Sequence, residues 1–217
     1  MAVVETPGLR EFLNCYPRMA IRPSIAGTLR LKGRFEFAAY HARQGDVHDS
    51  FALEIIVPDT FPKELPRTTE TGGRIPRTGE YHVNQTDNTL CLGSPLSLLL
   101  RLSKNPSLFG FAEICLVPYL FAVSRKLQIG GPLPFGELAH GSDGILADYS
   151  LLFGLKHPER VRYVLELLGM KKRRANKLPC PCGCRSPLGR CRFNLRLHEF
   201  RKIASRSLFR KEWLGLQ

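Results

Sequence analysis

The chain has 217 residues, 43% of them hydrophobic, and a formal net charge of +13 at pH 7. This composition excludes a disordered chain, because it supplies enough apolar side chains for a core. The longest apolar stretch is interrupted by Gly110, Glu113 and Pro118, so we expect no membrane span. The first residues lack the basic start and apolar block of a secretory signal, and we therefore expect a soluble, cytoplasmic protein.

The charge is distributed unevenly along the chain. Residues 1–155 contain 15 basic and 15 acidic side chains, whereas residues 156–217 contain 17 basic and 4 acidic side chains. An imbalance confined to one end of a chain indicates two functional parts. We therefore expect a neutral domain over residues 1–155 and a basic C-terminal module over residues 156–217.

The first half of the chain predicts one helix followed by strands. Thr6 is a suitable helix cap and Pro7 a suitable first helical residue, which predicts a helix over residues 6–15. Alternating and β-branched residues predict strands over residues 25–40, 50–57 and 68–71. Residues 77–93 contain many turn formers and no periodic pattern, so we expect a long irregular loop there.

The second half predicts helices. Apolar spacing indicates helices over residues 95–104, 108–128, 157–174 and 193–211, the second with a break near Pro118. Residues 130–144 have the composition of a linker or an irregular segment. The order of one helix, antiparallel strands, a long loop and several helices predicts an α+β fold.

The seven cysteines form two groups. Four of them fall within twelve residues: Cys180, Cys182, Cys184 and Cys191. The isolated ones are Cys15, Cys91 and Cys115, and the helical apolar patterns around the first and third predict core positions. An odd number of cysteines without an export signal argues against a disulfide scaffold. Reduced cysteines then serve as buried filler, as nucleophiles or as metal ligands.

Residues 53–95 contain an ordered set of short motifs, LEIIVPDTFPKELP and later YHVNQTDNTLCLGSP. This segment resembles the core of the ubiquitin-conjugating enzymes. In that family a strand leads into a proline-rich turn, and a His-Pro-Asn motif precedes the catalytic Cys-Leu. Here His82-Val83-Asn84 takes the place of the motif, and Asn84 lies seven residues before Cys91. The resemblance covers residues 5–128 and implies a UBC-like antiparallel sheet with flanking helices.

The resemblance also implies an activity centred on Cys91. A thiolate both attacks a thioester and leaves from one, so a single cysteine can accept an acyl group and pass it to an amine. The side-chain amide of Asn84 would stabilise the oxyanion, and Asp87 would orient or deprotonate the amine. Asn84 is equally suited to forming a turn, and His82 is better suited to a structural hydrogen bond than to the role of a base.

A second motif, KLPCPCGCRSPLGRCRF, occupies residues 177–193. The first two and the last of its cysteines have the spacing C-x-C-x8-C, which resembles the SEC-C-like zinc motif at the end of the bacterial secretion ATPase. Thiolates in a Pro/Gly turn and at a helix start suit a structural, tetrahedral zinc ion. The fourth ligand is Cys184 or His198. We favour Cys184, because His198 would have to reach back across about 10 Å of helix.

Together these motifs predict a ubiquitin-conjugating-like enzyme with a basic zinc module. The resemblance points to the type found in bacterial antiphage operons, with a nucleotidyltransferase C-terminus or a ubiquitin-like protein as acyl donor and another protein as acceptor. The basic tail is either a solvated face or a docking surface for nucleic acid or an acidic protein. The rival hypothesis is an inactive UBC-like scaffold whose basic zinc module binds such a partner.

Overall fold

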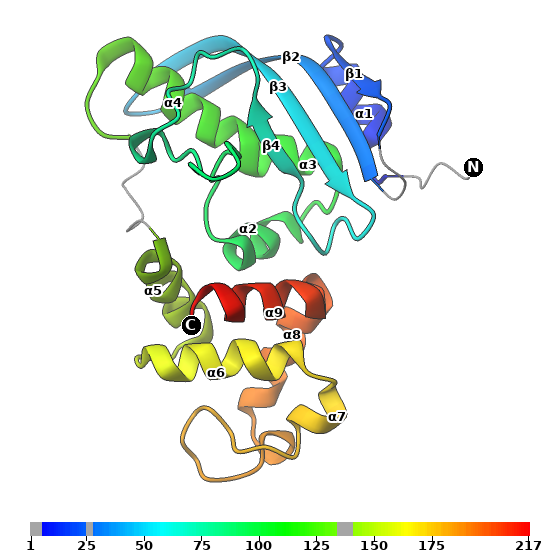
Figure 1. The fold of residues 1–217 in the computed structure, drawn as a ribbon, viewed down its shortest axis with the longest axis vertical. Helices are drawn as coiled ribbons and strands as arrows, with labels where there is room; N and C mark the ends of the chain where they lie inside the picture. The colour runs from blue at the N-terminus through cyan, green and yellow to red at the C-terminus, as the bar shows by residue number, and fades with distance from the viewer. Residues whose placement is uncertain (1–5, 25–27, 134–140) are drawn as a thin grey trace. The chain divides into compact units, whose positions relative to one another are not determined.

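A computed structural model describes residues 6–24, 28–133 and 141–217 (Figure 1). The chain divides into two compact units, each made of two stretches of sequence. Unit 1 consists of residues 1–93 and 101–137, and unit 2 consists of residues 94–100 and 138–217. The boundary expected after residue 155 therefore falls inside unit 2.

Unit 1 contains a four-stranded antiparallel sheet with the strand order β1-β2-β3-β4. The strands are β1 (Met19–Arg22), β2 (Thr28–His41), β3 (Gly45–Pro58) and β4 (Arg67–Glu70). In the long β2–β3 hairpin, Phe35 lies opposite Phe51 and Leu31 lies opposite Ile55. All four side chains are buried, because alternate residues of both strands face the core.

The three expected strands are present, and the expected α+β class is confirmed. The strand expected over residues 25–40 is β2, and residues 25–27 lie outside the described residues. The strand expected over residues 50–57 is β3, which begins five residues earlier. The strand expected over residues 68–71 is β4. The sequence does not predict β1, because its four residues between prolines are too few to show a period.

Helices cover one face of this sheet. α1 (Leu9–Cys15) precedes the strands, and a continuous helical run follows them, composed of α3 (Leu108–Phe111), a π-helical turn (Ala112–Leu116) and α4 (Val117–Ile129). Figure 1 shows α3 and α4 behind the sheet, and α4 contacts β2 and β3. The break expected near Pro118 is this wide turn, which accommodates a residue that lacks a backbone N–H.

The helical run Leu108–Ile129 is, within the described part of the chain, the only helix long and apolar enough to cross a membrane. Its most apolar window has a mean hydropathy of 1.5, and 72% of that window is buried inside the protein. The buried core helix of a folded protein passes the same test, so this helix is only a weak indication of a membrane span.

The expected start of α1 is wrong by three residues. The helix begins at Leu9 behind Gly8, whose φ of 72° is in the left-handed region that glycine adopts without strain. Thr6 does not cap the helix with its side chain. The carbonyl oxygen of Pro7 instead accepts a hydrogen bond of 2.7 Å from the backbone N–H of Leu108, which ties the start of α1 to α3.

The two cysteines expected in the core differ in their burial. Cys115 is buried as expected, and this burial raises the pKa of its thiol to about 11. Cys15 is exposed, so the expectation of a core position is wrong for this residue. α1 has only two turns, and the buried side chains are those of Phe12 within it and Tyr16 directly after it, which leaves Cys15 on the outer face.

The regular elements of unit 2, within its described residues, are all helices. It takes the first part of α2 (Pro95–Leu102) together with α5 (Gly141–Phe153), α6 (Pro158–Gly169), α7 (Lys172–Ala175), a 3₁₀ turn (Leu188–Arg190), α8 (Phe193–Ile203) and α9 (Arg206–Gly215). The rings of Phe153 and Phe200 meet edge to face at 5.0 Å. The hydroxyl of Tyr149 donates a hydrogen bond of 2.6 Å to Glu212, so α5 is joined to both C-terminal helices.

The helices expected in the second half are present but divided. The helix expected over residues 157–174 ends at Gly169, and α7 forms a separate turn. The helix expected over residues 193–211 is interrupted at Ser205, whose hydroxyl caps α9 by accepting from the backbone N–H of Leu208 at 3.1 Å. Of the linker expected over residues 130–144, residues 134–140 lie outside the described residues and residues 141–144 belong to α5.

Candidate functional site

Cys91 lies in the loop that follows β4, and it is exposed. An isolated bridge between Val83 and Leu90 closes this loop on itself. The backbone N–H of Leu90 donates to the carbonyl of Thr68 in β4 at 2.8 Å, and the N–H of Cys91 donates to the carbonyl of His82 at 2.7 Å. The backbone at Cys91 is therefore fixed to the sheet and to the HVN motif.

Two residues with left-handed backbone conformation shape the loop. His82 has a φ of 51° and ends the 3₁₀ turn Gly79–Tyr81, with its N–H donating to the carbonyl of Gly79 at 2.9 Å. Asn88 has a φ of 56°, and its N–H donates to the carbonyl of Asn84 at 2.8 Å. Asparagine and histidine adopt this conformation more readily than most residues, which explains how the chain doubles back before Cys91.

Asn84 and Asp87 belong to one hydrogen-bond network centred on Thr89. The side-chain amide of Asn84 donates to the Thr89 hydroxyl at 2.7 Å, and that hydroxyl donates to Asp87 at 2.6 Å. Arg67 forms an ion pair of 2.6 Å with the second oxygen of Asp87. The Thr89 hydroxyl and, to a smaller extent, Arg67 hold the pKa of the Asp87 carboxyl below its ordinary value against the opposing effect of desolvation.

This network bears on the roles expected for both residues. One N–H of the Asn84 amide is used by Thr89, and a primary amide has a second N–H that is free to act elsewhere. The Asp87 carboxylate already accepts from a hydroxyl and a guanidinium, so an incoming amine would compete with Arg67 for it. Among the expected site residues, the structure joins Asn84 to Asp87 through Thr89 and joins His82 to Cys91 through the backbone.

Two residues of α4 contribute to this site and are not recognisable from the sequence. The Tyr119 hydroxyl donates to the carbonyl of Tyr81 at 2.8 Å, and Lys126 donates to the carbonyl of Glu80 at 2.9 Å. Burial raises the pKa of Tyr119 above its usual range. Their spacing of seven residues places Tyr119 and Lys126 on one helix face, but it does not indicate which loop they hold.

We expect the substitution Tyr119→Phe to loosen the loop that carries Cys91. It removes the donor to the Tyr81 carbonyl, and leaving a buried acceptor unpaired costs about 1–3 kcal/mol of unfolding free energy. Hydrogen exchange at the Cys91 amide should become faster, as measured by mass spectrometry. Tyr40→Phe serves as the control, because the Tyr40 side chain is 71% exposed. Unchanged exchange at Cys91 in the Tyr119 variant would rule out this anchoring role.

The four clustered cysteines form a second candidate site. The Sγ atoms of Cys180, Cys182, Cys184 and Cys191 all lie within 4.8 Å of one another and could hold a metal ion. The Sγ atoms of Cys180 and Cys182 are 3.2 Å apart, and those of Cys182 and Cys191 are 3.6 Å apart. A tetrahedral zinc ion with Zn–S bonds of 2.3 Å separates its sulfur ligands by about 3.8 Å, so the arrangement fits such an ion closely.

Local backbone hydrogen bonds bring these sulfur atoms together. The N–H of Cys180 donates to the carbonyl of Ser186 at 2.9 Å, and the N–H of Gly183 donates to the carbonyl of Cys180 at 3.2 Å. Gly183 has a φ of 87°, which permits the tight turn between the cysteines. At the start of α8, the N–H of Phe193 donates to Cys191 Sγ at 3.4 Å, as is suitable for a thiolate ligand.

Of the two residues expected as the fourth ligand, the structure brings Cys184 to the other three. His198 is not part of the group that the described residues form, and its Nδ1 atom is buried without a hydrogen-bond partner among them. The backbone N–H of Ser186 lowers the pKa of Cys184 to about 7, whereas burial raises the pKa of Cys180. Cys184 is the exposed member of the cluster.

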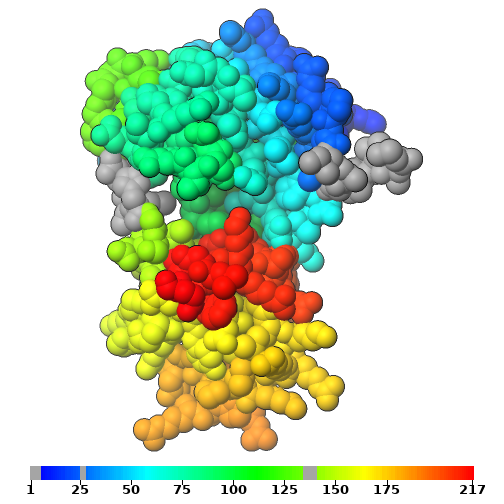
Figure 2. Space-filling view, in the orientation of Figure 1, coloured from blue at the N-terminus to red at the C-terminus, as the bar shows by residue number. Residues whose placement is uncertain are grey.

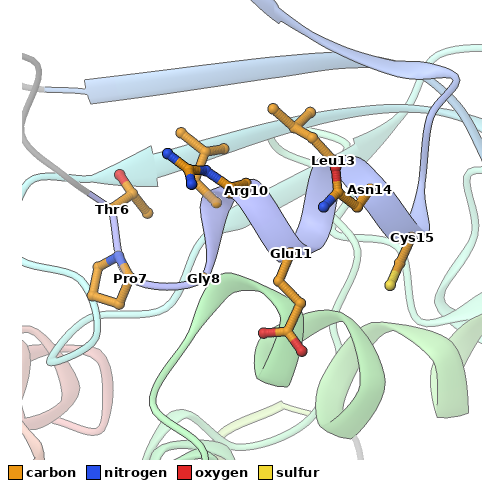
Figure 3. A pocket seen from close by; sticks show the side chains of 9 residues that line it. Thr6, Pro7, Gly8, Arg10, Glu11, Leu13, Asn14 and Cys15 are labelled. Carbon is orange, nitrogen blue, oxygen red and sulfur yellow. The ribbon is translucent and has the colours of Figure 1, made fainter.

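A hollow of about 1290 Å³ lies along α1 and is lined by residues 6–11 and 13–15 (Figure 3). Figure 3 shows the side chains of Glu11 and Cys15 on one side of the helix and those of Arg10 and Leu13 on the other. These groups do not converge on a common point, and Cys91 is not among the lining residues. We therefore assign no chemistry to this hollow.

The Cys91 loop and the cysteine cluster are thus the two candidate sites in the described residues. No family model matches the chain, and neither a curated protein nor a solved structure matches it. The sites are therefore interpreted from their own geometry and from the motifs of residues 53–95.

Proposed function

We propose that the protein is an acyltransferase of ubiquitin-conjugating type that carries a protein C-terminal acyl group as a thioester on Cys91. The observation that carries the proposal is the exposure of Cys91 on a backbone fixed by the His82 carbonyl. A loop supported by a rigid sheet can present a reactive group to partners as large as another protein. Buried structural cysteines such as Cys115 lack this access.

The reaction has two steps. The Cys91 thiolate attacks the carbonyl carbon of an activated acyl donor, and the donor's leaving group departs with the electron pair of the broken bond. An amine of the acceptor then attacks the thioester, loses a proton to a base, and releases the Cys91 thiolate. The donor we propose is the C-terminus of a nucleotidyltransferase or of a ubiquitin-like protein, in bacterial antiphage defence.

The fold of unit 1 supports this proposal at a coarse level. Its order of α1, a four-stranded antiparallel sheet, an irregular loop and helices agrees with the order that the resemblance implies. Cys91 lies seven residues after Asn84 in the sequence. The hydrogen bond from its backbone N–H to the carbonyl of His82 joins it to the HVN motif. The HVN motif and Cys91 are therefore part of one local structure.

We further propose that the cysteine cluster holds a structural zinc ion. Four thiolates complete the tetrahedral coordination of Zn²⁺ and leave no open position for a substrate or a water molecule. Such a site supplies folding free energy rather than catalysis. The ion would fix the segment that connects α7 to α8.

The proposed activity is tested by mapping the acyl adduct. The protein is co-expressed with the products of its neighbouring genes and isolated without reductant, and the adduct is expected to disappear on treatment with a thiol. Tryptic digestion should locate it on the peptide of residues 78–101, which contains Cys91 as its only cysteine. An adduct that resists thiols, or one located on another peptide, would contradict a thioester on Cys91.

The substitution Asn84→Ala tests whether this amide stabilises the oxyanion. If it does, discharge of the thioester to an amine should slow by about 10²-fold, whereas loading of Cys91 should change less. Thr89→Val is the matched variant, because it breaks the same hydrogen bond but leaves the Asn84 amide in place. Single-turnover discharge is measured for both. Equal effects in the two variants would assign Asn84 to loop structure alone.

A further inference from the structure

The segment around the cysteine cluster carries an unusual excess of positive charge. No acidic residue occurs between Glu166 and Glu199. Nine basic residues lie in that interval: Lys171, Lys172, Arg173, Arg174, Lys177, Arg185, Arg190, Arg192 and Arg196. We call the surface that they form the basic surface. It is built from α7, the cysteine turn, the 3₁₀ turn and the start of α8, which all belong to unit 2.

All nine side chains of the basic surface are exposed, and none forms an ion pair with another residue in the described part of the chain. Other cations of unit 2 have structural roles. Arg162 donates to the carbonyl of Leu216 at 2.5 Å, and Arg210 donates to that of Gly169 at 3.0 Å. The basic surface therefore consists of charges that the fold does not use for its own stability.

The charges are displayed on a fixed backbone rather than on a flexible tail. The N–H of Leu188 donates to the carbonyl of Leu178 at 2.8 Å, and the N–H of Gly189 donates to that of Asn176 at 2.9 Å. The two arms of the cysteine segment are thereby held side by side. Figure 2 shows this segment, in yellow-orange to orange, with side chains that project from the surface.

A bound zinc ion would leave most of this charge in place. Four thiolates and one Zn²⁺ ion have a net charge of −2, against the nine positive charges of the surrounding side chains. Nine like charges in 26 residues repel one another and destabilise the folded state unless an anionic partner neutralises them. A polyanionic partner therefore accounts for this charge density better than exposure to solvent alone does.

The composition of the basic surface favours phosphate groups over the carboxylates of an acidic protein. Six of the nine residues are arginines, whose forked guanidinium matches a phosphate with two parallel hydrogen bonds. Protein interfaces usually centre on buried aromatic anchors. Within residues 171–196 the only large apolar side chain that is strongly exposed is Leu195, at 70%. Phe193, the one aromatic residue in this range, is partly buried, and the lack of a strongly exposed aromatic ring argues against single strands, which bind by stacking.

We propose that the basic surface binds the phosphate backbone of double-stranded nucleic acid without preference for base sequence. The binding is electrostatic, and neutralised phosphates release their counterions to the solvent. It is independent of the thiol chemistry at Cys91, since none of the nine residues belongs to unit 1.

The test measures binding of a fluorescent 20-base-pair duplex to the full chain by anisotropy, at several salt concentrations. The variant carries Lys172→Ala, Arg173→Ala, Arg190→Ala and Arg192→Ala. The control carries the same change of charge on unit 1, at four exposed residues: Arg22→Ala, Lys32→Ala, Arg34→Ala and Arg43→Ala. Each lost phosphate contact reduces the slope of log K against log salt by about 1, so the variant's slope should fall by about 3 to 4.

At 100 mM salt the variant should bind the duplex at least about 10²-fold more weakly than the control. Cys91→Ser should bind as well as the unchanged chain, which separates this proposal from the proposed acyltransferase. Circular dichroism and metal content show whether the variant remains folded. Equal affinities of variant and control would overturn the proposal. Binding of polyglutamate through the same four residues, with none of the duplex, would overturn it in favour of an acidic protein.

Discussion

Cys91→Ser is expected to eliminate transfer to an amine, with a loss of at least about 10³-fold in rate. An alcohol is a far weaker nucleophile than a thiolate, and an ester on serine is a poorer acyl donor than a thioester. The variant should therefore either form no adduct or hold an adduct that thiols do not release. Both outcomes are visible on gels run with and without reductant, followed by mass spectrometry.

Cys15→Ser is the appropriate control for this experiment. Cys15 and Cys91 both belong to unit 1 and are both exposed, so a general thiol reagent should label both. Only Cys91 lies in the loop with the HVN motif, and Cys15→Ser should leave the adduct unchanged. Equal adduct yields from the Cys91→Ser and unchanged proteins would refute the proposed function. Equal labelling of the two thiols would not refute it, because an accessible thiol is not necessarily a catalytic nucleophile.

Removal of zinc is expected to unfold the segment between α7 and α8 and to leave unit 1 intact. The segment contributes few buried apolar side chains apart from Leu188, so metal binding must supply its folding free energy. In zinc-finger peptides this contribution is about 10–16 kcal/mol. Exchange at the amides of Leu188 and Gly189 should increase strongly after chelation, whereas α6 and α9, which pack together, should stay protected.

Two single substitutions identify the fourth ligand of this ion. Cys184→Ala should lower the zinc affinity by at least about 10²-fold, because it removes one of four sulfur ligands. His198→Ala should change the affinity by less than about 3-fold. Competition with a chromophoric chelator measures both, and metal analysis of the purified protein should give about one zinc ion per chain. A metal-free chain with a protease-resistant C-terminus would show that the cysteines have another purpose.

The sequence predicts the parts of the fold that depend on local patterns. Alternation along residues 25–40 identifies most of β2, and the apolar, β-branched run of residues 50–57 identifies the second half of β3, because both patterns are local. The sequence does not predict α5, since Gly141 and Gly144 in its first turn resemble a linker. The helix is stabilised instead by the burial of Tyr149 and Phe153, a tertiary effect that propensity does not contain.

The same distinction applies to the candidate sites. The cysteine cluster can be predicted, because all four cysteines lie within twelve residues and local turns bring them together. The surroundings of Cys91 cannot be predicted, since Tyr119 and Thr89 act through hydrogen bonds whose partners are set by tertiary packing. The exposure of Cys15 also follows from the shortness of α1, which its apolar pattern does not reveal.

The interleaving of the two units in sequence limits how the protein can be dissected. Residues 94–100 begin three positions after Cys91 but belong to unit 2, where the hydroxyls of Ser94 and Ser97 donate to Asp148. A chain shortened to residue 137 would lose this acceptor while keeping both serines. Unit 2 therefore cannot be removed by a single cut in the sequence. Any exchange of modules between homologous chains would have to replace residues 94–100 together with residues 138–217.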